Sequence, residues 1–212
     1  MTRFGGLVVR RECWTLSTRG RVVTLGLAVA LIVAAVLGAY PFLAVTRAIQ
    51  GTVLVVEGWV PTYTLEQAAD EFKHGHYQKV LVVRPYDVDK SKSALVLAKL
   101  VDCGILPADL DVVYHPVVRK DRTYNMALSV KEWLLEHEMS SVRLNVATLG
   151  PHARRSRLMF EKAFGSTAPI GIIALEDLTY DSKRWWRTSE GVREVLGETI
   201  AYVYAKFFFV WN

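Results

Sequence analysis

The stretch TLGPHARRSRLMFEKAFG, from Thr148 to Gly165, decides the fold because it joins a strand to a helix. The apolar run that ends at Val146 is typical of a buried strand. Gly150 and Pro151 then mark the start of a helix, since proline is suited to the first helical turn. We expect that helix to continue to Phe164.

Three arginines crowd the first turns of this predicted helix: Arg154, Arg155 and Arg157. A helix N-terminus carries about half a positive charge, so cations are mildly unfavourable there. His152 and Arg155 share one helical face, where backbone N–H groups and a guanidinium suit a phosphate or a carboxylate. We therefore expect Arg155 to bind an anion, and Arg154 and Arg157 to be solvated or paired with local acids. The alternative is that Arg155 pairs with a structural acid such as Glu57.

Strand and helix patterns alternate on both sides of this stretch. Short apolar runs predict five strands, over residues 51–57, 79–83, 111–115, 142–148 and 170–175. Helical spacing predicts helices between them, over residues 64–75, 91–103, 122–137 and 151–164. This alternation predicts one α/β domain with a parallel sheet of about five strands flanked by helices.

The closing segment, residues 189–212, carries apolar residues at helical spacing. They are Val192, Val195, Leu196, Ile200, Val203 and Phe207. We expect this helix to pack against the sheet. The alternative is that the terminal FFFVW, residues 207–211, touches lipid or a partner.

The leader contains no charged residue between Val22 and Thr46. At about 1.5 Å per helical residue, this segment is long enough to cross a hydrocarbon core of roughly 30 Å. A cleaved signal peptide is the alternative, but its apolar region usually has only about 7 to 15 residues. Five arginines precede the segment and only Arg47 closely follows it, which places the N-terminus in the cytoplasm.

These patterns predict a basic cytoplasmic N-terminus over residues 1–21, a single-pass anchor in the cytoplasmic membrane over 22–46 and an extracytoplasmic α/β domain over 47–212. The formal net charge of +5 belongs entirely to residues 1–50, and the remainder of the chain is neutral by formal count, so a nucleic-acid partner is not indicated. Cys13 and Cys103 would lie on opposite sides of the membrane, and two such residues make neither a disulfide framework nor a metal cluster. We expect Cys103 to be buried among apolar neighbours.

Polar residues follow three of the predicted strands directly. In an open parallel sheet, ligands bind beyond the carboxyl ends of the strands, at the point where strand order reverses. We therefore expect these residues to converge, with Glu57 and His152 as candidate acid and base. The expected ligand-binding residues are Gly58, Trp59, Arg122, Thr123, Asn125, Thr148 and Arg155.

Four segments together resemble a family of proteins of unknown function, that of SanA, ElyC and YdcF. They are TVLVVEGWVPTYTLEQAADEF, DRTYNMALSVKEWL, ATLGPHARRSRLMFEKAFG and WWRTSEGVREVLGETIAYVYAKF. The most specific pattern is Thr-x-x-x-His-x-x-Arg, formed by Thr148, His152 and Arg155. The resemblance implies a Rossmann-like fold behind a membrane anchor, and a role in envelope or polysaccharide biogenesis.

The chain departs from the family pattern at two places. Many members carry Asn-Thr-x-Glu-Asn-Ala where this chain has residues 122–127, RTYNMA, so the Glu and the second Asn are absent. The stretch VVRPYD, residues 82–87, replaces a Ser-Gly that is common after the second strand. EGW, residues 57–59, matches a subgroup of the family.

Two functions stay open at this stage. The first is an enzyme that acts on an anionic envelope precursor, either a free small molecule or a lipid-linked one. The second is a non-catalytic module that binds a ligand or protein and organises envelope synthesis, with nucleotide or S-adenosylmethionine-type binding as a further alternative. Phosphate-loop, nucleophile-elbow and dinucleotide-binding motifs are absent from the sequence, so no reaction and no cofactor can be assigned.

Overall fold

The computed structural model describes residues 2–3, 8–9, 15–87, 89–139, 143–165 and 168–210 of the chain. Cys13, Val142, Trp211 and Asn212, which the sequence predictions include, lie outside these residues. The chain divides into two compact units, Met1–Leu37 and Gly38–Asn212.

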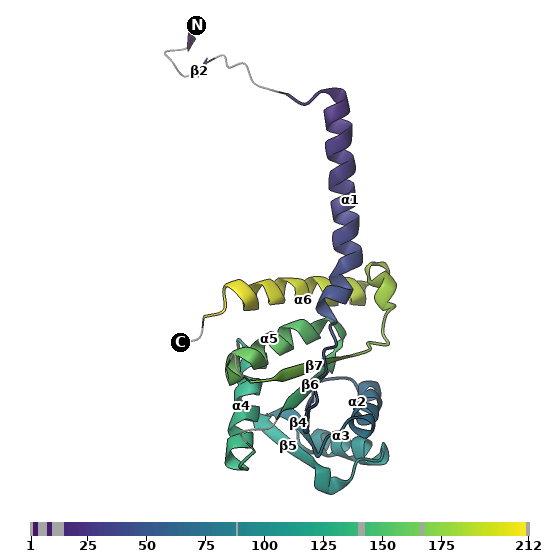
Figure 1. Cartoon of the computed structure of the whole chain (residues 1–212), viewed down its shortest axis with the longest axis vertical. Coiled ribbons are helices and arrows are strands. Elements are labelled where there is room, and N and C mark those ends of the chain that lie inside the picture. The colour runs from purple at the N-terminus through teal and green to yellow at the C-terminus, as the bar shows by residue number, and fades with distance from the viewer. Residues whose placement is uncertain are drawn as a thin grey trace. The chain divides into compact units, whose positions relative to one another are not determined.

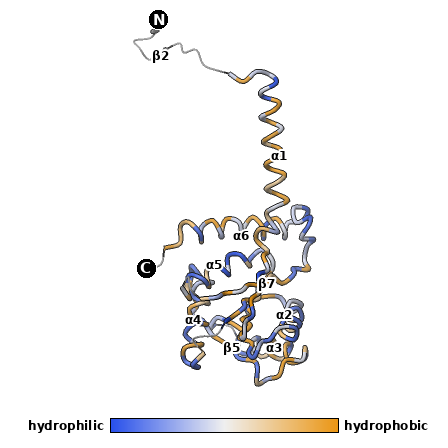
Figure 2. Tube along the Cα trace, in the orientation of Figure 1, coloured by the Kyte–Doolittle hydropathy of each residue, from blue (hydrophilic) through white to orange (hydrophobic). Residues whose placement is uncertain are grey.

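The first unit contains most of an apolar helix. Two short strands, β1 (Thr2–Arg3) and β2 (Val8–Val9), pair antiparallel. The helix α1 (Thr18–Leu43) is long and apolar enough to cross a membrane, and Figure 2 shows hydrophobic residues along most of its length. It begins and ends earlier than the predicted segment 22–46, and its last turn, from Gly38, belongs to the second unit.

The second unit is built on a five-stranded parallel sheet, so the predicted α/β fold is confirmed. Its strands are β3 (Val53–Glu57), β4 (Lys79–Pro85), β5 (Leu110–His115), β6 (Leu144–Leu149) and β7 (Ile170–Leu175). Their order is β5-β4-β3-β6-β7, and all neighbours run parallel. The central strand β3 is fully buried, as its continuous apolar sequence predicts.

Helices cover both faces of this sheet (Figure 1). One face packs on α2 (Thr62–His74) and α3 (Lys90–Asp102), through a cluster that includes Leu54, Leu65 and Leu100. The other face packs on α4 (Arg122–Glu136) and α5 (Ala153–Phe164), through a cluster that includes Val55, Val130 and Phe160. The last helix, α6 (Ser189–Phe207), packs on α5. Short 3-10 turns span Pro107–Asp109, Gly150–His152 and Ser182–Arg187.

The segment after α1 is tied to the edge of the sheet. Arg47 pairs antiparallel with Ile172 of β7. The buried amide of Asn145 then accepts from the backbone N–H of Ile49 (2.9 Å) and donates to the carbonyl of Ile49 (2.8 Å). Gly171 leaves room for this amide, since a Cβ there would lie 1.7 Å from Asn145 Oδ1. These contacts attach the segment that directly follows the apolar helix to the sheet of the second unit.

The helix expected to start at Pro151 starts slightly later. Gly150, Pro151 and His152 form a 3-10 turn, and the α-helix begins at Ala153. Gly150 has a φ of 33°, a backbone conformation that L side chains rarely adopt. The turn buries His152 and leaves the three arginines on the first turns of α5.

The expected packing of the closing helix against the sheet is wrong for most of its apolar residues. Val195 is buried, but Leu196, Ile200, Val203 and Phe207 are exposed. The reason is that α6 rests on α5 rather than on the sheet, with its small and acidic residues turned inward. The apolar spacing predicts the helix and not the direction of its apolar face.

The order of the strands creates a crevice between β3 and β6. After β3 the chain passes outward through β4 to β5, and it then returns to β6 on the other side of β3. The connection after β3 leads to α2 on one face, and the connection after β6 leads to α5 on the opposite face. The carboxyl ends of β3 and β6 are therefore a topological switch point, where ligands of open α/β sheets bind.

Candidate functional site

A carboxylate stands at this switch point, fully removed from solvent. Glu57 ends β3 and is 0% exposed. Its Oε2 accepts from the indole Nε1 of Trp59 (2.8 Å) and the hydroxyl of Thr148 (2.7 Å), and its Oε1 accepts from the hydroxyl of Ser156 (2.6 Å). Burial would raise the pKa of Glu57, but the nearby His152 and the hydroxyls of Ser156 and Thr148 outweigh burial and hold the pKa below its ordinary value.

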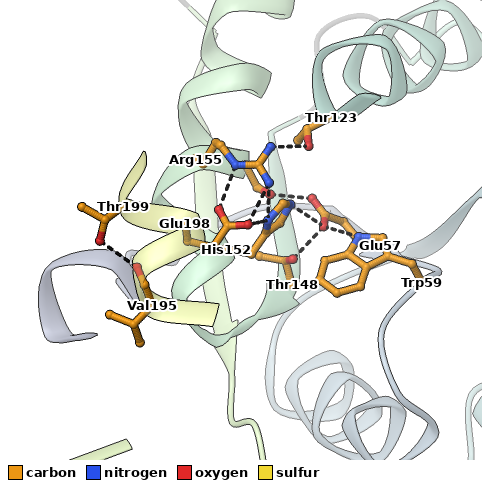
Figure 3. Close-up of polar contacts among 10 residues, drawn as sticks. Glu57, Trp59, Thr123, Thr148, His152, Arg155, Val195, Glu198 and Thr199 are labelled. Carbon is orange, nitrogen blue, oxygen red and sulfur yellow. Dashed lines mark hydrogen bonds and ion pairs between the residues drawn. The ribbon is translucent and has the colours of Figure 1, made fainter. Parts of the chain in front are cut away.

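His152 lies between two carboxylates (Figure 3). Its Nε2 is 3.3 Å from Oε2 of Glu57, and its Nδ1 is 2.9 Å from Oε1 of Glu198 on α6. Burial would lower the pKa of His152, but the two carboxylates outweigh burial and raise it to about 9. The imidazole is therefore protonated at neutral pH, with Nδ1 hydrogen-bonded to Glu198 and Nε2 close to Glu57 without a hydrogen bond to it. The indole of Trp59 packs edge-on against the ring, 5.1 Å between centroids.

Arg155 pairs with Glu198 through two parallel bonds. Its Nε donates to Oε2 (2.8 Å) and its Nη2 donates to Oε1 (2.9 Å), while Nη1 donates to the hydroxyl of Thr123 (3.2 Å). His152 and Arg155 together hold the pKa of Glu198 well below its usual range. Arg155 is therefore paired with a carboxylate of the protein, which was the alternative to anion binding. That carboxylate is Glu198 and not Glu57.

The other two arginines also have partners within the chain. Arg154 donates to the carbonyl of Phe42 at the end of α1, and its guanidinium lies 3.9 Å from the centre of the Phe42 ring. Arg157 donates to Glu161 one turn further along α5 (2.8 Å). Each arginine at the start of α5 therefore has a nearby partner for its guanidinium, which explains how the helix tolerates three cations there.

A cavity of about 740 Å³ opens beside this network. Its wall includes His152 and Arg155 at the switch point and Glu194 and Glu198 from α6. The loop between β5 and α4 contributes further residues, among them Arg119, Lys120, Asp121 and Arg122. Asp121 has a positive φ of 55°, rare for a residue other than glycine, at the point where this loop becomes α4.

The structure brings most of the predicted site residues together, but not all onto the cavity wall. Trp59, Arg122, Thr123, His152 and Arg155 line the cavity, whereas Glu57 and Thr148 lie behind His152 in the network. The two remaining residues, Gly58 and Asn125, are not among the lining residues. Gly58 has a packing role, since a Cβ there would lie 2.3 Å from Cδ of Arg84. Asn125 donates to the carbonyl of Asp121 (3.0 Å) within the first turn of α4.

Two carboxylates of the site, Glu194 and Glu198, were not predicted from the sequence. They are four residues apart on α6, so they share one helical face, and that face points inward while the apolar residues point outward. Burial and the charge of Glu198 raise the pKa of Glu194 above its ordinary value. Their spacing was visible in the sequence, but acids on a helix are ordinarily assigned to its solvated face.

Comparisons with known proteins add no assignment to this geometry. No family model matches the chain, and no curated protein matches it. Among the described residues, no group of three or more His, Cys, Asp or Glu side chains is placed to hold a metal ion. The site is therefore defined by its own contacts: a buried Glu–His–Glu–Arg network at the switch point of an α/β domain.

Replacing Arg155 should destabilise the protein far more than replacing Arg157. Arg155→Ala leaves the largely buried Glu198 with one cationic partner, and removing one member of a buried pair costs about 3 kcal/mol or more. Arg157→Ala breaks an exposed i,i+4 pair, which contributes only about 0.3–0.5 kcal/mol. Urea unfolding of the full chain in detergent, followed by tryptophan fluorescence, measures both. Equal losses would contradict a structural role for the Arg155–Glu198 pair.

The stability of the protein should depend on pH through His152. Its pKa rises from 6.5 to about 9 on folding, so the stabilisation is fully present below pH 6.5 and is lost as pH rises through 9. A shift of this size corresponds at most to about 3 kcal/mol. Unfolding free energies at pH 6.5 and 9.5 should therefore differ more in the wild type than in His152→Gln. The same pH dependence in both proteins would show that His152 is not charged by its neighbours.

Proposed function

We propose that the second unit binds a small anionic envelope precursor, bearing a phosphate or a carboxylate, in the cavity at the switch point. The observation that carries this proposal is the set of exposed cations on the cavity wall: Arg119, Lys120 and Arg122. No ion pair joins any of them to another described residue. Arg155, the cation expected to hold the ligand, already faces Glu198.

The charges around the cavity support an anion at the β5–α4 loop rather than at α5. The network of Glu57, His152, Arg155 and Glu198 sums to zero formal charge when His152 is protonated. The lining residues Arg119, Lys120 and Arg122 face only two further acids on the wall outside α6, Asp87 and Asp121. A small excess of positive charge therefore remains at the loop, and Arg is suited to bidentate contacts with phosphate and carboxylate.

An enzymatic form of this function would use Glu194 for proton transfer. Glu57 is fully buried and does not line the cavity, and His152 is held between the carboxylates of Glu57 and Glu198. Glu194 lines the cavity, is half-buried and has a raised pKa, which brings it toward the range of a general acid or base. We therefore assign the acid–base role to Glu194, in place of Glu57 and His152.

The second candidate function is a non-catalytic binding or scaffold module of envelope synthesis. The polar network favours it, because the contacts of Glu198 with His152 and Arg155 hold α6 against α5 without a ligand. In this form the cavity would bind an anion, and Glu194 would only adjust its affinity.

We place this unit outside the cytoplasmic membrane, behind α1 as an uncleaved anchor. The support is the apolar length of α1 and the excess of arginine before it. The resemblance to the SanA, ElyC and YdcF proteins adds the envelope context to the proposal.

Ligand binding should depend on Arg122 and not on Arg157. A thermal-shift screen of the full chain in detergent, with phosphosugars, nucleotides, lipid-phosphate head groups and divalent metals, selects the probe. A lost charge-assisted contact costs about 1.5–3 kcal/mol, so Arg122→Ala should weaken binding by roughly tenfold or more in calorimetric titration. Arg157→Ala, whose partner is Glu161, should leave the affinity unchanged.

The outcome separates the two candidate functions. If the selected probe is converted, Glu194→Gln should abolish turnover while the probe still binds. Binding without conversion favours the module. The absence of any stabilising probe, or an unchanged affinity in Arg122→Ala, would refute anion binding in the cavity.

The orientation of the anchor should place the C-terminus outside the cytoplasm. An alkaline phosphatase fusion after Asn212 is expected to be active, because that enzyme matures only outside, and a green fluorescent protein fusion there is expected to be dark. The reverse pattern would invert the topology, and release of the domain into the medium would indicate a cleaved leader.

A further inference from the structure

The helix α6 has its apolar side on the outside. Between Arg193 and Phe207, exposed aliphatic and phenylalanine side chains recur every three or four positions, at Leu196, Ile200, Val203 and Phe207, and Tyr204 is exposed as well. This apolar stripe spans twelve residues, from Leu196 to Phe207, or about 16 Å of helix. Ile200 and Phe207 are 71% and 74% exposed, values far above those of residues that cover a core. Figure 2 shows hydrophobic colour recurring along α6.

The inward face of the same helix is fully used. Val195 and Ala205 are buried, and Glu194 and Glu198 line the cavity. The apolar stripe therefore cannot be buried inside this unit. The helix stays in this orientation because turning the stripe inward would remove Glu198 from His152 and Arg155.

The chain enters this unit beside α6. The last turn of α1, which belongs to the second unit, places the Phe42 ring 5.6 Å from the Tyr202 ring of α6. Arg154 joins the two elements, since it donates to the carbonyl of Phe42 and stacks on that ring. The end of the helix that we propose as the membrane anchor therefore packs directly on α6, through Tyr202.

Basic and aromatic residues surround the stripe as they do at a membrane surface. The turn before α6 exposes Trp186 together with Lys183, Arg184 and Arg187, and α6 itself exposes Arg193 and Lys206. Over residues 181–207 the exposed acids are only Asp181 and Glu190. Phe207 and Phe208 are exposed as well, whereas Phe209 packs against Tyr124. Basic residues beside an apolar helical face favour the interface of a bilayer with anionic lipids.

We propose that α6 lies on the surface of the bilayer that α1 crosses, with its apolar stripe in the lipid interface. This inference rests on the proposed membrane anchor. One helix then joins the bilayer to the candidate site, because its outer face contacts lipid while Glu194 and Glu198 on its inner face border the cavity. The cavity is held at the membrane surface rather than being free to move away from it.

Fluorescence quenching at single cysteines tests this placement in the full chain. In a background with Cys13→Ser and Cys103→Ala, an environment-sensitive label is attached at Ile200→Cys, and the protein is reconstituted in vesicles of phosphatidylethanolamine and phosphatidylglycerol. Leu95→Cys on α3 is the matched control, because Leu95 is an apolar helical residue with 69% exposure. Val29→Cys in α1 reports the anchor itself.

Lipids that carry a quenching group should cause a loss of fluorescence at Ile200→Cys that approaches the loss at Val29→Cys, with little loss at Leu95→Cys. Iodide in the aqueous phase should quench Leu95→Cys most strongly. Quenching at Ile200→Cys by iodide alone would place α6 in water, and protection from both quenchers would place a protein against it; either result overturns the inference. An absence of lipid quenching at Val29→Cys would instead overturn the proposed anchor.

Discussion

The rest of the site depends on one buried charge, the carboxylate of Glu57 at the end of the central strand. A carboxylate without solvent is stable only if donors and a counter-charge surround it. Trp59, Thr148 and Ser156 supply the donors, and His152 supplies the charge. The protonated His152 then requires a second carboxylate, Glu198. These successive pairings of charges fix where α5 begins and where α6 packs.

The network also explains why α6 has an unusual arrangement of its residues. A helix that closes a domain ordinarily turns its apolar face inward, because burial of that face drives packing. Here two ionic contacts to Glu198 and the small residues next to α5 decide the orientation instead. The apolar face is left outside. The proposed contact with lipid gives that face a favourable environment.

Much of the candidate site could be predicted, because the carboxyl ends of parallel strands lie along one edge of the sheet. Thr148 lies 91 positions after Glu57 in the sequence and His152 follows Thr148 closely, yet both meet Glu57 for this reason. The role of Arg155 could not be predicted in the same way. Its partner lies on α6, and the sequence does not show which face of α6 meets α5. Because Arg155 is paired with Glu198, the cations of the β5–α4 loop are the ones left to bind an anion in the cavity.

The sequence by itself determined the apolar helix and the order of strands and helices, and thereby the α/β fold with a parallel sheet. These features follow from local periodicity and chain connectivity, which are written along the chain. Only the tertiary structure decided which charges neutralise one another and which side of α6 faces solvent. Such choices depend on distances between elements far apart in sequence, and a contact of about 3 Å between Glu57 and His152 or between Arg155 and Glu198 exists only after the layers have packed.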